Sequence, residues 1–137
     1  MKLLDTDTLS LLIQKHAKVV ARFDSEPDTS ITVISYIEMI RGRFDAVIKA
    51  EDGEKILKAQ FRLEATIVRL DSMRSIPLKQ SSAALFDKLL LDKKLRKIGR
   101  GDILIACIAL AANATLITRN VRDFKLVPHL RIENWAD

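Results

Sequence analysis

The chain has 137 residues, of which 48% are apolar and 30% are charged, and its formal net charge is +5. This length corresponds to one domain, expected to span residues 1–137, that hides roughly two-thirds of the surface of its unfolded chain. No apolar run approaches the length of a membrane span, so the composition excludes a transmembrane protein.

The first half of the chain is expected to alternate between short strands and helices. Residues 2–4 form a buried strand, and the small polar residues after it are good N-caps for a helix that starts near Thr8 and continues or restarts as far as Phe23. The β-branched run 31–34 predicts a second strand. Helical spacing follows from Ser35, breaks near residues 51–53 and then resumes.

The second half repeats this alternation. A brief third strand is expected at 75–78, an amphipathic helix at 81–95, a loop at 98–101, a buried helix at 102–113, a fourth strand at 115–118 and a fifth at 130–133. Strands that alternate with helices imply a parallel sheet with right-handed crossovers. We therefore predict an α/β fold of three layers, α/β/α, around a central parallel sheet of four to five strands.

Four acidic residues lie beside apolar runs, where solvated charges are least expected: Asp5, Glu38, Asp102 and Asp123. In a parallel sheet, ligands bind beyond the carboxyl ends of the strands, and each of these acids is predicted to reach that edge, with Glu38 and Asp102 in first helical turns. Carboxylates held close together repel, which raises a pKa or requires a cation. Oxygen ligands suit Mg2+ or Mn2+, so this pattern indicates a metal-dependent enzyme that acts on phosphates.

Each acid also has a structural explanation when it is taken alone. Asp5 or Asp7 could cap the next helix, Asp102 could complement a helix dipole, and Asp123 could be a turn residue. Glu38 is harder to explain in this way, because it lies among apolar neighbours and a partly buried Glu without a partner is uncommon. The joint arrangement of the four acids favours a site.

Other residues could also carry chemistry. His16 and His129 could be the acid and base of a metal-free ribonuclease, although surface histidines are the simpler interpretation. The single Cys107 lies in an apolar run and has no partner, which predicts a buried structural cysteine. No P-loop, dinucleotide fingerprint or nucleophile elbow is present.

A basic cluster precedes Asp102, and a pI of about 9.5 also favours a polyanionic partner. The residues expected to contact RNA phosphates are Lys93, Lys94, Arg96, Lys97 and Arg100. Lys88 precedes this cluster. Asp5 interrupts the N-terminal apolar residues before a signal peptide could form, so we expect a cytoplasmic protein with no membrane association.

Four blocks of the sequence, in order, resemble the PIN-domain ribonucleases, and specifically the VapC-type toxins of toxin–antitoxin pairs. Leu4-Asp5-Thr6-Asp7 resembles the opening block of that family, the segment 32–42 with Glu38 resembles the second, and Gly101–Ala106 resembles the third. The segment Thr118–Phe124 is similar to the fourth block. Asp7 departs from the pattern, because the family usually has Asn at that position; we expect it to be a helix cap.

The resemblance implies a PIN-like fold and a Mg2+- or Mn2+-dependent endoribonuclease of structured RNA. It implies that Asp5, Glu38, Asp102 and Asp123 bind metal and that Thr118 and Asn120 orient the site. The expected mechanism is metal-assisted hydrolysis. A homodimer and inhibition by a small antitoxin protein are also implied.

Two alternatives remain open at this stage: a housekeeping PIN nuclease for RNA maturation, and a non-catalytic RNA- or protein-binding module on the same fold. For the toxin, we expect the antitoxin to place an Arg among the acids. The helices after Ser35 and Gly53 carry many apolar residues, and we expect them to line its groove.

Overall fold

The computed structural model describes all residues from 1 to 137 and has a five-stranded parallel sheet at its centre. The strands are β1 (Lys2–Leu4), β2 (Thr29–Thr32), β3 (Ser75–Ile76), β4 (Thr115–Ile117) and β5 (Arg131–Glu133). Their order in the sheet is β3-β2-β1-β4-β5, with every pair parallel. The chain therefore adds β2 and β3 on one side of β1 and then β4 and β5 on the other side. This reversal places the topological switch point between β1 and β4.

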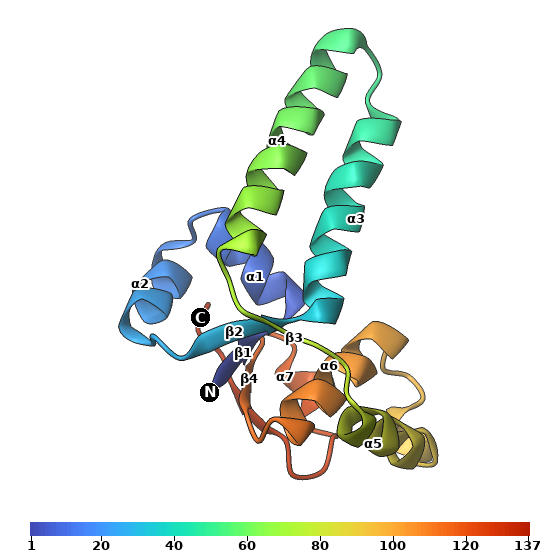
Figure 1. Ribbon diagram of the computed structural model, residues 1–137. Helices are drawn as coiled ribbons and strands as arrows, with labels where there is room; N and C mark the ends of the chain where they lie inside the picture. Colours follow the sequence, from blue (N-terminus) through green and yellow to red (C-terminus); the bar gives the residue numbers. More distant parts are fainter.

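Helices cover both faces of the sheet, and the predicted three-layer α/β/α architecture is confirmed (Figure 1). The helices are α1 (Thr6–Ile13), α2 (Ala17–Ser25), α3 (Val33–Lys49), α4 (Gly53–Asp71), α5 (Gln80–Leu90), α6 (Arg100–Ala111) and α7 (Val121–Phe124). A short 3-10 turn, η1, covers Lys93–Leu95. None of these helices combines the length and the apolar character needed to cross a membrane.

The two cores on either side of the sheet follow from the alternation of side chains along β1. Leu3 belongs to the core beneath α5 and α6, whereas Leu4 belongs to the core beneath α1 and the bases of α3 and α4. Both leucines are fully buried, as is Cys107 in α6. The prediction of a buried structural cysteine is therefore confirmed.

Several element boundaries differ from the sequence prediction by a few residues. The second strand ends at Thr32, because the Thr32 side chain accepts a hydrogen bond from the Ser35 amide and starts α3 at Val33. Helix α1 starts at Thr6 and not near Thr8, since Asp5 is its cap. Helix α6 starts at Arg100, within the segment expected to be a loop.

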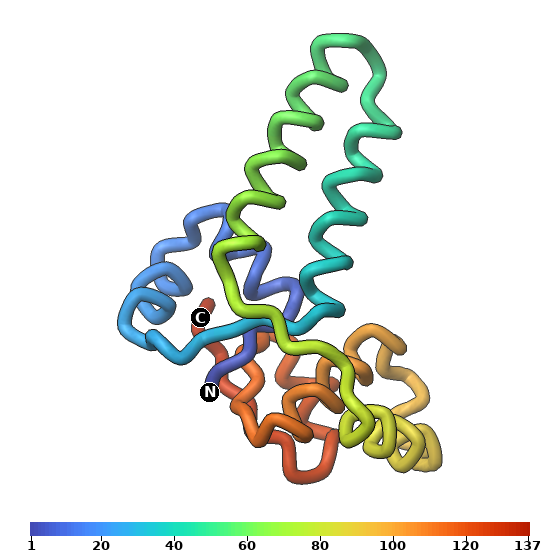
Figure 2. Tube along the Cα trace, in the orientation of Figure 1, coloured from blue at the N-terminus to red at the C-terminus, as the bar shows by residue number.

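Helices α3 and α4 form a long hairpin that projects away from the sheet (Figures 1 and 2). Its outer surfaces retain exposed apolar side chains: Ile37, Phe44 and Ile48 on α3, and Leu57, Phe61 and Val68 on α4. Phe61 is 73% exposed, which is unusual for a large aromatic residue. These helices therefore carry an apolar surface that the chain itself does not cover.

Candidate active site

The acidic site lies at the carboxyl edge of the sheet, where β1 and β4 end beside each other. Leu4 pairs with both Ile31 and Ile117, so the residues that follow these three strands leave the sheet at one level. Asp5 follows Leu4, and its amide donates to the carbonyl oxygen of Ile117 at 3.0 Å. The strand ends therefore fix Asp5 at the switch point.

A small cavity of about 190 Å³ opens at this edge. Its lining contains no hydrophobic residue and consists of Asp5, Thr6, Asp7, Glu38, Asp102 and Asn120. These residues come from the start of α1, from α3, from the first turn of α6 and from the N-cap of α7. Segments that lie far apart in the sequence thus contribute oxygen-bearing side chains to one polar cavity.

Asp5 is the most buried of the acids, at 3% exposure, and it is also the N-cap of α1. Its Oδ1 accepts a hydrogen bond of 2.8 Å from the amide of Thr8. Burial raises the pKa of Asp5, while hydrogen bonds from Thr118 and Thr8 oppose this effect. Asp5 can therefore cap α1 and contribute a carboxylate to the cavity at the same time.

Asp102 is half-buried in the first turn of α6, and its pKa is raised to about 6. Burial is the largest cause, followed by repulsion from Asp5, Glu38, Asp7 and Asp123. The other three predicted acids therefore lie close enough to Asp102 to raise its pKa.

Glu38 lies in the second turn of α3, not in the first turn as expected, because the helix begins earlier, at Val33. Its Oε1 accepts a hydrogen bond of 2.6 Å from the Thr6 hydroxyl. Thr6 was not predicted as a site residue. Its position directly after Asp5 was the only signal available in the sequence.

Asp123 lies in α7, beside the cavity and not in its lining. Asn120 caps this short helix, because its Oδ1 accepts a hydrogen bond from the backbone amide of Asp123. Its side-chain Nδ2 donates to Asp123 Oδ2 at 3.0 Å, and its backbone amide donates to Thr118 Oγ1 at 2.9 Å. Thr118 is fully buried. Thr118 and Asn120 thus form the hydrogen-bonded connection between β4 and Asp123.

Asp7 is exposed in the first turn of α1 and lines the cavity. The expectation that it caps this helix was wrong, because Asp5 is the cap. Asp7 instead adds negative charge that raises the pKa of both Asp5 and Asp102.

The other predicted groups lie outside the cavity. Lys93, Lys94, Arg96, Lys97 and Arg100 are exposed on η1 and at the start of α6. The Arg100 guanidinium lies over the Phe86 ring, 5.3 Å from its centroid. Neither His16 nor His129 lines the cavity, so the histidine pair gains no support as a catalytic centre.

The donor chemistry of the cavity fits a hard divalent cation, because its carboxylate, hydroxyl and amide oxygens are the ligands that Mg2+ and Mn2+ prefer. No group of three or more Asp, Glu, His or Cys side chains forms a ready-made metal cage. The cavity therefore fits a divalent cation in the type and charge of its side chains, and not as a preformed set of metal ligands.

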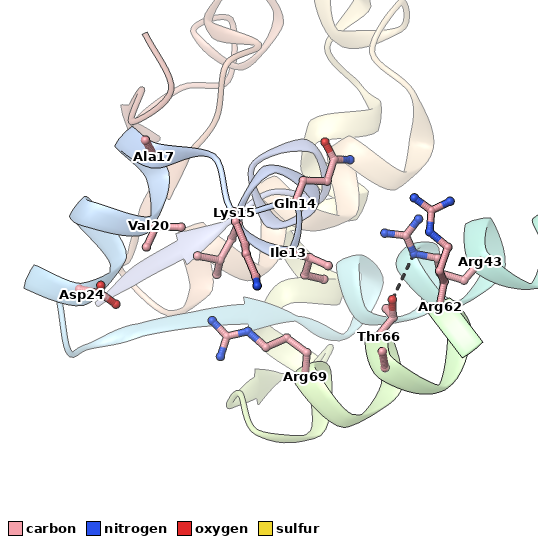
Figure 3. Close-up of a pocket in the computed structure, with 12 residues that line it drawn as sticks. Ile13, Gln14, Lys15, Ala17, Val20, Asp24, Arg43, Arg62, Thr66 and Arg69 are labelled. Atoms are coloured by element: carbon pink, nitrogen blue, oxygen red, sulfur yellow. Dashed lines mark hydrogen bonds between the residues drawn. The ribbon is translucent and has the colours of Figure 1, made fainter. Parts of the chain in front are cut away.

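A larger cleft of about 650 Å³, here called the arginine cleft, lies between the α1–α2 corner and the α3–α4 hairpin (Figure 3). Its cations are Lys15, Arg43, Arg62 and Arg69, with Asp24 as its one acid and with Leu12, Ile13 and Val20 among its apolar residues. Arg43 Nε donates to Thr66 Oγ1 at 3.1 Å, and Arg69 stacks on Phe23. None of the four cations forms an ion pair, whereas Lys55 and Lys58 of the same hairpin pair with Glu51 and Glu54.

The sequence matches the family described as PIN domain over residues 2–130. It is 31% identical to Ribonuclease VapC1 of Haemophilus influenzae over 138 residues, which covers 98% of this chain and 97% of the relative. Among solved structures, it is similar to VapBC-1 from nontypeable Haemophilus influenzae, with 26% identity, a TM-score of 0.76 and coverage of 99% and 98% of the two chains. It is also similar to VapBC2 from Rickettsia felis bound to a promoter DNA fragment, with 28% identity, a TM-score of 0.74 and 98% coverage of each chain.

Proposed function

The chain belongs to the PIN-domain family and, within it, to the VapC ribonucleases, and from this premise we propose that it is the toxin of a toxin–antitoxin pair that hydrolyses structured RNA in the cytoplasm with a divalent metal ion. A single feature carries the catalytic part of this function. It is the polar cavity that Asp5, from the end of β1, and Asp102, from α6, line together with Glu38.

Asp5, Glu38 and Asp102 would hold the ion, with Asp123 beside them. A divalent ion, when bound, stabilises charge that develops on a phosphate and lowers the pKa of water. The side chains of the chain supply a fixed frame: the cap bond to Thr8 holds Asp5, and the Asn120 amide holds Asp123. Burial and repulsion from the other acids raise the pKa of Asp102 to about 6, and a bound divalent cation would offset this repulsion.

The purified chain should cleave a structured RNA when Mg2+ or Mn2+ is added and should lose this activity in EDTA. Asp102→Asn, purified in parallel, should be inactive, which excludes a contaminating nuclease. Asp87→Asn removes an exposed carboxylate of α5 outside the cavity and should cleave like the wild type. Undiminished cleavage in EDTA would instead favour His16 and His129.

The arginine cleft is the proposed docking site for the antitoxin. It combines apolar side chains with unpaired guanidinium groups, the combination that anchors many protein interfaces. An amphipathic segment with acidic side chains complements both features. The exposed apolar residues of the α3–α4 hairpin provide further surface for the same partner.

Charge reversal tests this docking site. Arg62→Glu combined with Arg69→Glu should prevent co-purification of the neighbouring gene product while RNA cleavage is retained. Lys58→Glu, on the same helix but outside the cleft, is the matched control. Unchanged co-purification of the double variant would place the antitoxin elsewhere.

Growth separates the toxin from the maturation nuclease. Expression of the chain alone should stop growth, and co-expression with its neighbour should restore it. Normal growth while soluble chain accumulates would favour the housekeeping nuclease.

The homodimer is also part of the proposal. Leu90 and Leu91 are 43% and 82% exposed and provide apolar surface to a second copy.

A further inference from the structure

Glu38 reaches the cavity differently from the other acids. Asp5 and Asp102 are held by a strand end and by the first turn of a helix, whereas Glu38 extends from the second turn of α3 on a longer side chain. A Glu side chain loses considerable rotamer freedom when it is fixed in one place. A site that uses this carboxylate therefore needs groups that hold it.

Thr6 holds one oxygen of this carboxylate. Its Oγ1 lies 2.6 Å from Glu38 Oε1 and 3.0 Å from Ser35 Oγ. A hydroxyl has one hydrogen and an ionised carboxylate only accepts, so Thr6 donates to Glu38 and Ser35 supplies the hydrogen between the two hydroxyls. Ser35 is fully buried, and its amide donates to Thr32 Oγ1 at 3.1 Å. A short chain of hydroxyl groups thus ends on Glu38.

Gly101 borders the other oxygen. A Cβ atom at this position would lie 3.1 Å from Glu38 Oε2 and 3.6 Å from its Cδ. Such a contact is shorter than ordinary van der Waals separation. No glycine in the chain has a positive φ, so the backbone conformation does not require glycine here. The space that Gly101 leaves is occupied by the carboxylate.

We propose that Thr6 and Gly101 are positioning residues that fix the Glu38 carboxylate between α1 and α6 for the proposed nuclease reaction. Thr6 attracts Oε1, and Gly101 leaves room for Oε2. Neither residue needs to touch the substrate. Both act through Glu38, so their effects should disappear when Glu38 can no longer serve as an anionic ligand.

Removal of the Thr6 hydroxyl is the first test. Thr6→Val should reduce kcat/KM for RNA by about tenfold or more, the ratio expected for the loss of a hydrogen bond to a charged group. Thr6→Ser retains the hydroxyl and should restore most of the activity. Thr29→Val is the matched control, since the Thr29 hydroxyl also makes a 2.6 Å bond, but to the carbonyl of Glu26 and remote from the cavity.

A binding measurement provides a readout independent of turnover. Titration with Mn2+, followed by electron paramagnetic resonance, should show weaker binding for Thr6→Val and unchanged binding for Thr29→Val. In a Glu38→Gln background, Thr6→Val should have no further effect on either quantity. If Thr6→Val reduced Mn2+ binding and cleavage by the same factor in Glu38→Gln as in the wild type, Thr6 would not act through Glu38, and the proposal would be overturned.

Gly101→Ala is the second test, and it is expected to fold. Alanine is a better helix former than glycine, so α6 should be at least as stable. Mn2+ binding and cleavage should nevertheless fall. Gly42→Ala in α3 is the control, because nothing lies within 4 Å of its added Cβ. Wild-type binding and cleavage by Gly101→Ala would overturn the role of Gly101. If the wild-type protein cleaved no RNA but the variants showed the expected differences in Mn2+ binding, the proposed nuclease function would be refuted. The positioning roles of Thr6 and Gly101 would then still stand.

Discussion

Asp5 Oδ1 and the amide of Thr8 are 2.8 Å apart, so the acid at the centre of the site is also the residue that starts α1. One carboxylate oxygen is committed to the helix, and Asp5 as a whole is almost completely buried. Its structural and chemical roles can be separated by substitution, because Asn caps helices about as well as Asp does.

Asp5→Asn should therefore abolish RNA cleavage while the fold stays as stable or becomes more stable, since the change removes a buried charge near other carboxylates. Asp5→Ala loses the cap as well and should cost about 1 kcal/mol of stability. Thermal melts and cleavage assays of both variants test this. Near-normal turnover of Asp5→Asn would leave Asp5 with a structural role only.

Asp102 makes the stability of the metal-free protein depend on pH. Its folded pKa of about 6 lies above the ordinary value of 3.8, so the folded state binds this proton more tightly. The stabilisation is complete below the unfolded pKa and is lost as the pH rises through about 6. The loss should amount to about 1–2 kcal/mol, less than full conversion of the shift because Asp102 is only half-buried.

Urea unfolding in EDTA from about pH 4 to about pH 8 measures this effect. Asp102→Asn should show a smaller decline over this range, with a remaining slope from Asp5, whose pKa is also raised. Identical pH profiles for wild type and Asp102→Asn would contradict the assignment.

Asp7→Asn should have the mildest effect among the acids of the cavity. Asp7 is exposed, and interactions between exposed charges contribute less than about 1 kcal/mol. Cleavage should stay within about fivefold of wild type. A complete loss of activity, comparable to that of Asp102→Asn, would instead make Asp7 a member of the essential set.

Glu133 should stabilise the contact between the C-terminal strand and the start of the chain. It accepts hydrogen bonds from Lys2 and from the Trp135 indole and pairs with Arg22 at 3.2 Å, and these contacts lower its pKa. This stabilisation is present above the unfolded pKa and is lost as the pH falls through the lowered folded value.

Glu133→Gln should cost less than about 1 kcal/mol at neutral pH, because the ion pairs are partly solvated, and cleavage should be unchanged. Glu54→Gln is the control, since Glu54 pairs with Lys58 on the exposed surface of α4. A melting temperature of Glu133→Gln equal to that of the control would rule out the predicted contribution.

The sequence patterns predicted the succession of strands and helices along the chain and the edge of the sheet at which the acids meet, but not the order of the strands in the sheet. Asp5 could be placed because it follows two leucines of β1, and Asp102 because it opens the most apolar helix. The start of α3 could not be placed, since Val33 and Ile34 favour a strand by themselves and the Thr32 cap overrides that preference.

The parts of the site that were missed depend on contacts between elements. Nothing local distinguishes Gly101 from Gly99, yet only Gly101 faces a carboxylate. The apolar surplus of α3 and α4 predicted a surface for a partner, but only the three-dimensional arrangement shows that Phe61 and Val68 are among its uncovered residues.

The pairing of β1 with β4 has a consequence for the synthesis of the protein. Lys2 pairs with Thr115, so the central strand is made among the first residues and its neighbour among the last. Before Ile117 is synthesised, Asp5 lacks the carbonyl that fixes its amide, and Asp123 has not yet been made. Chains that end before β4 are therefore expected to lack the acidic cavity and should not cut RNA.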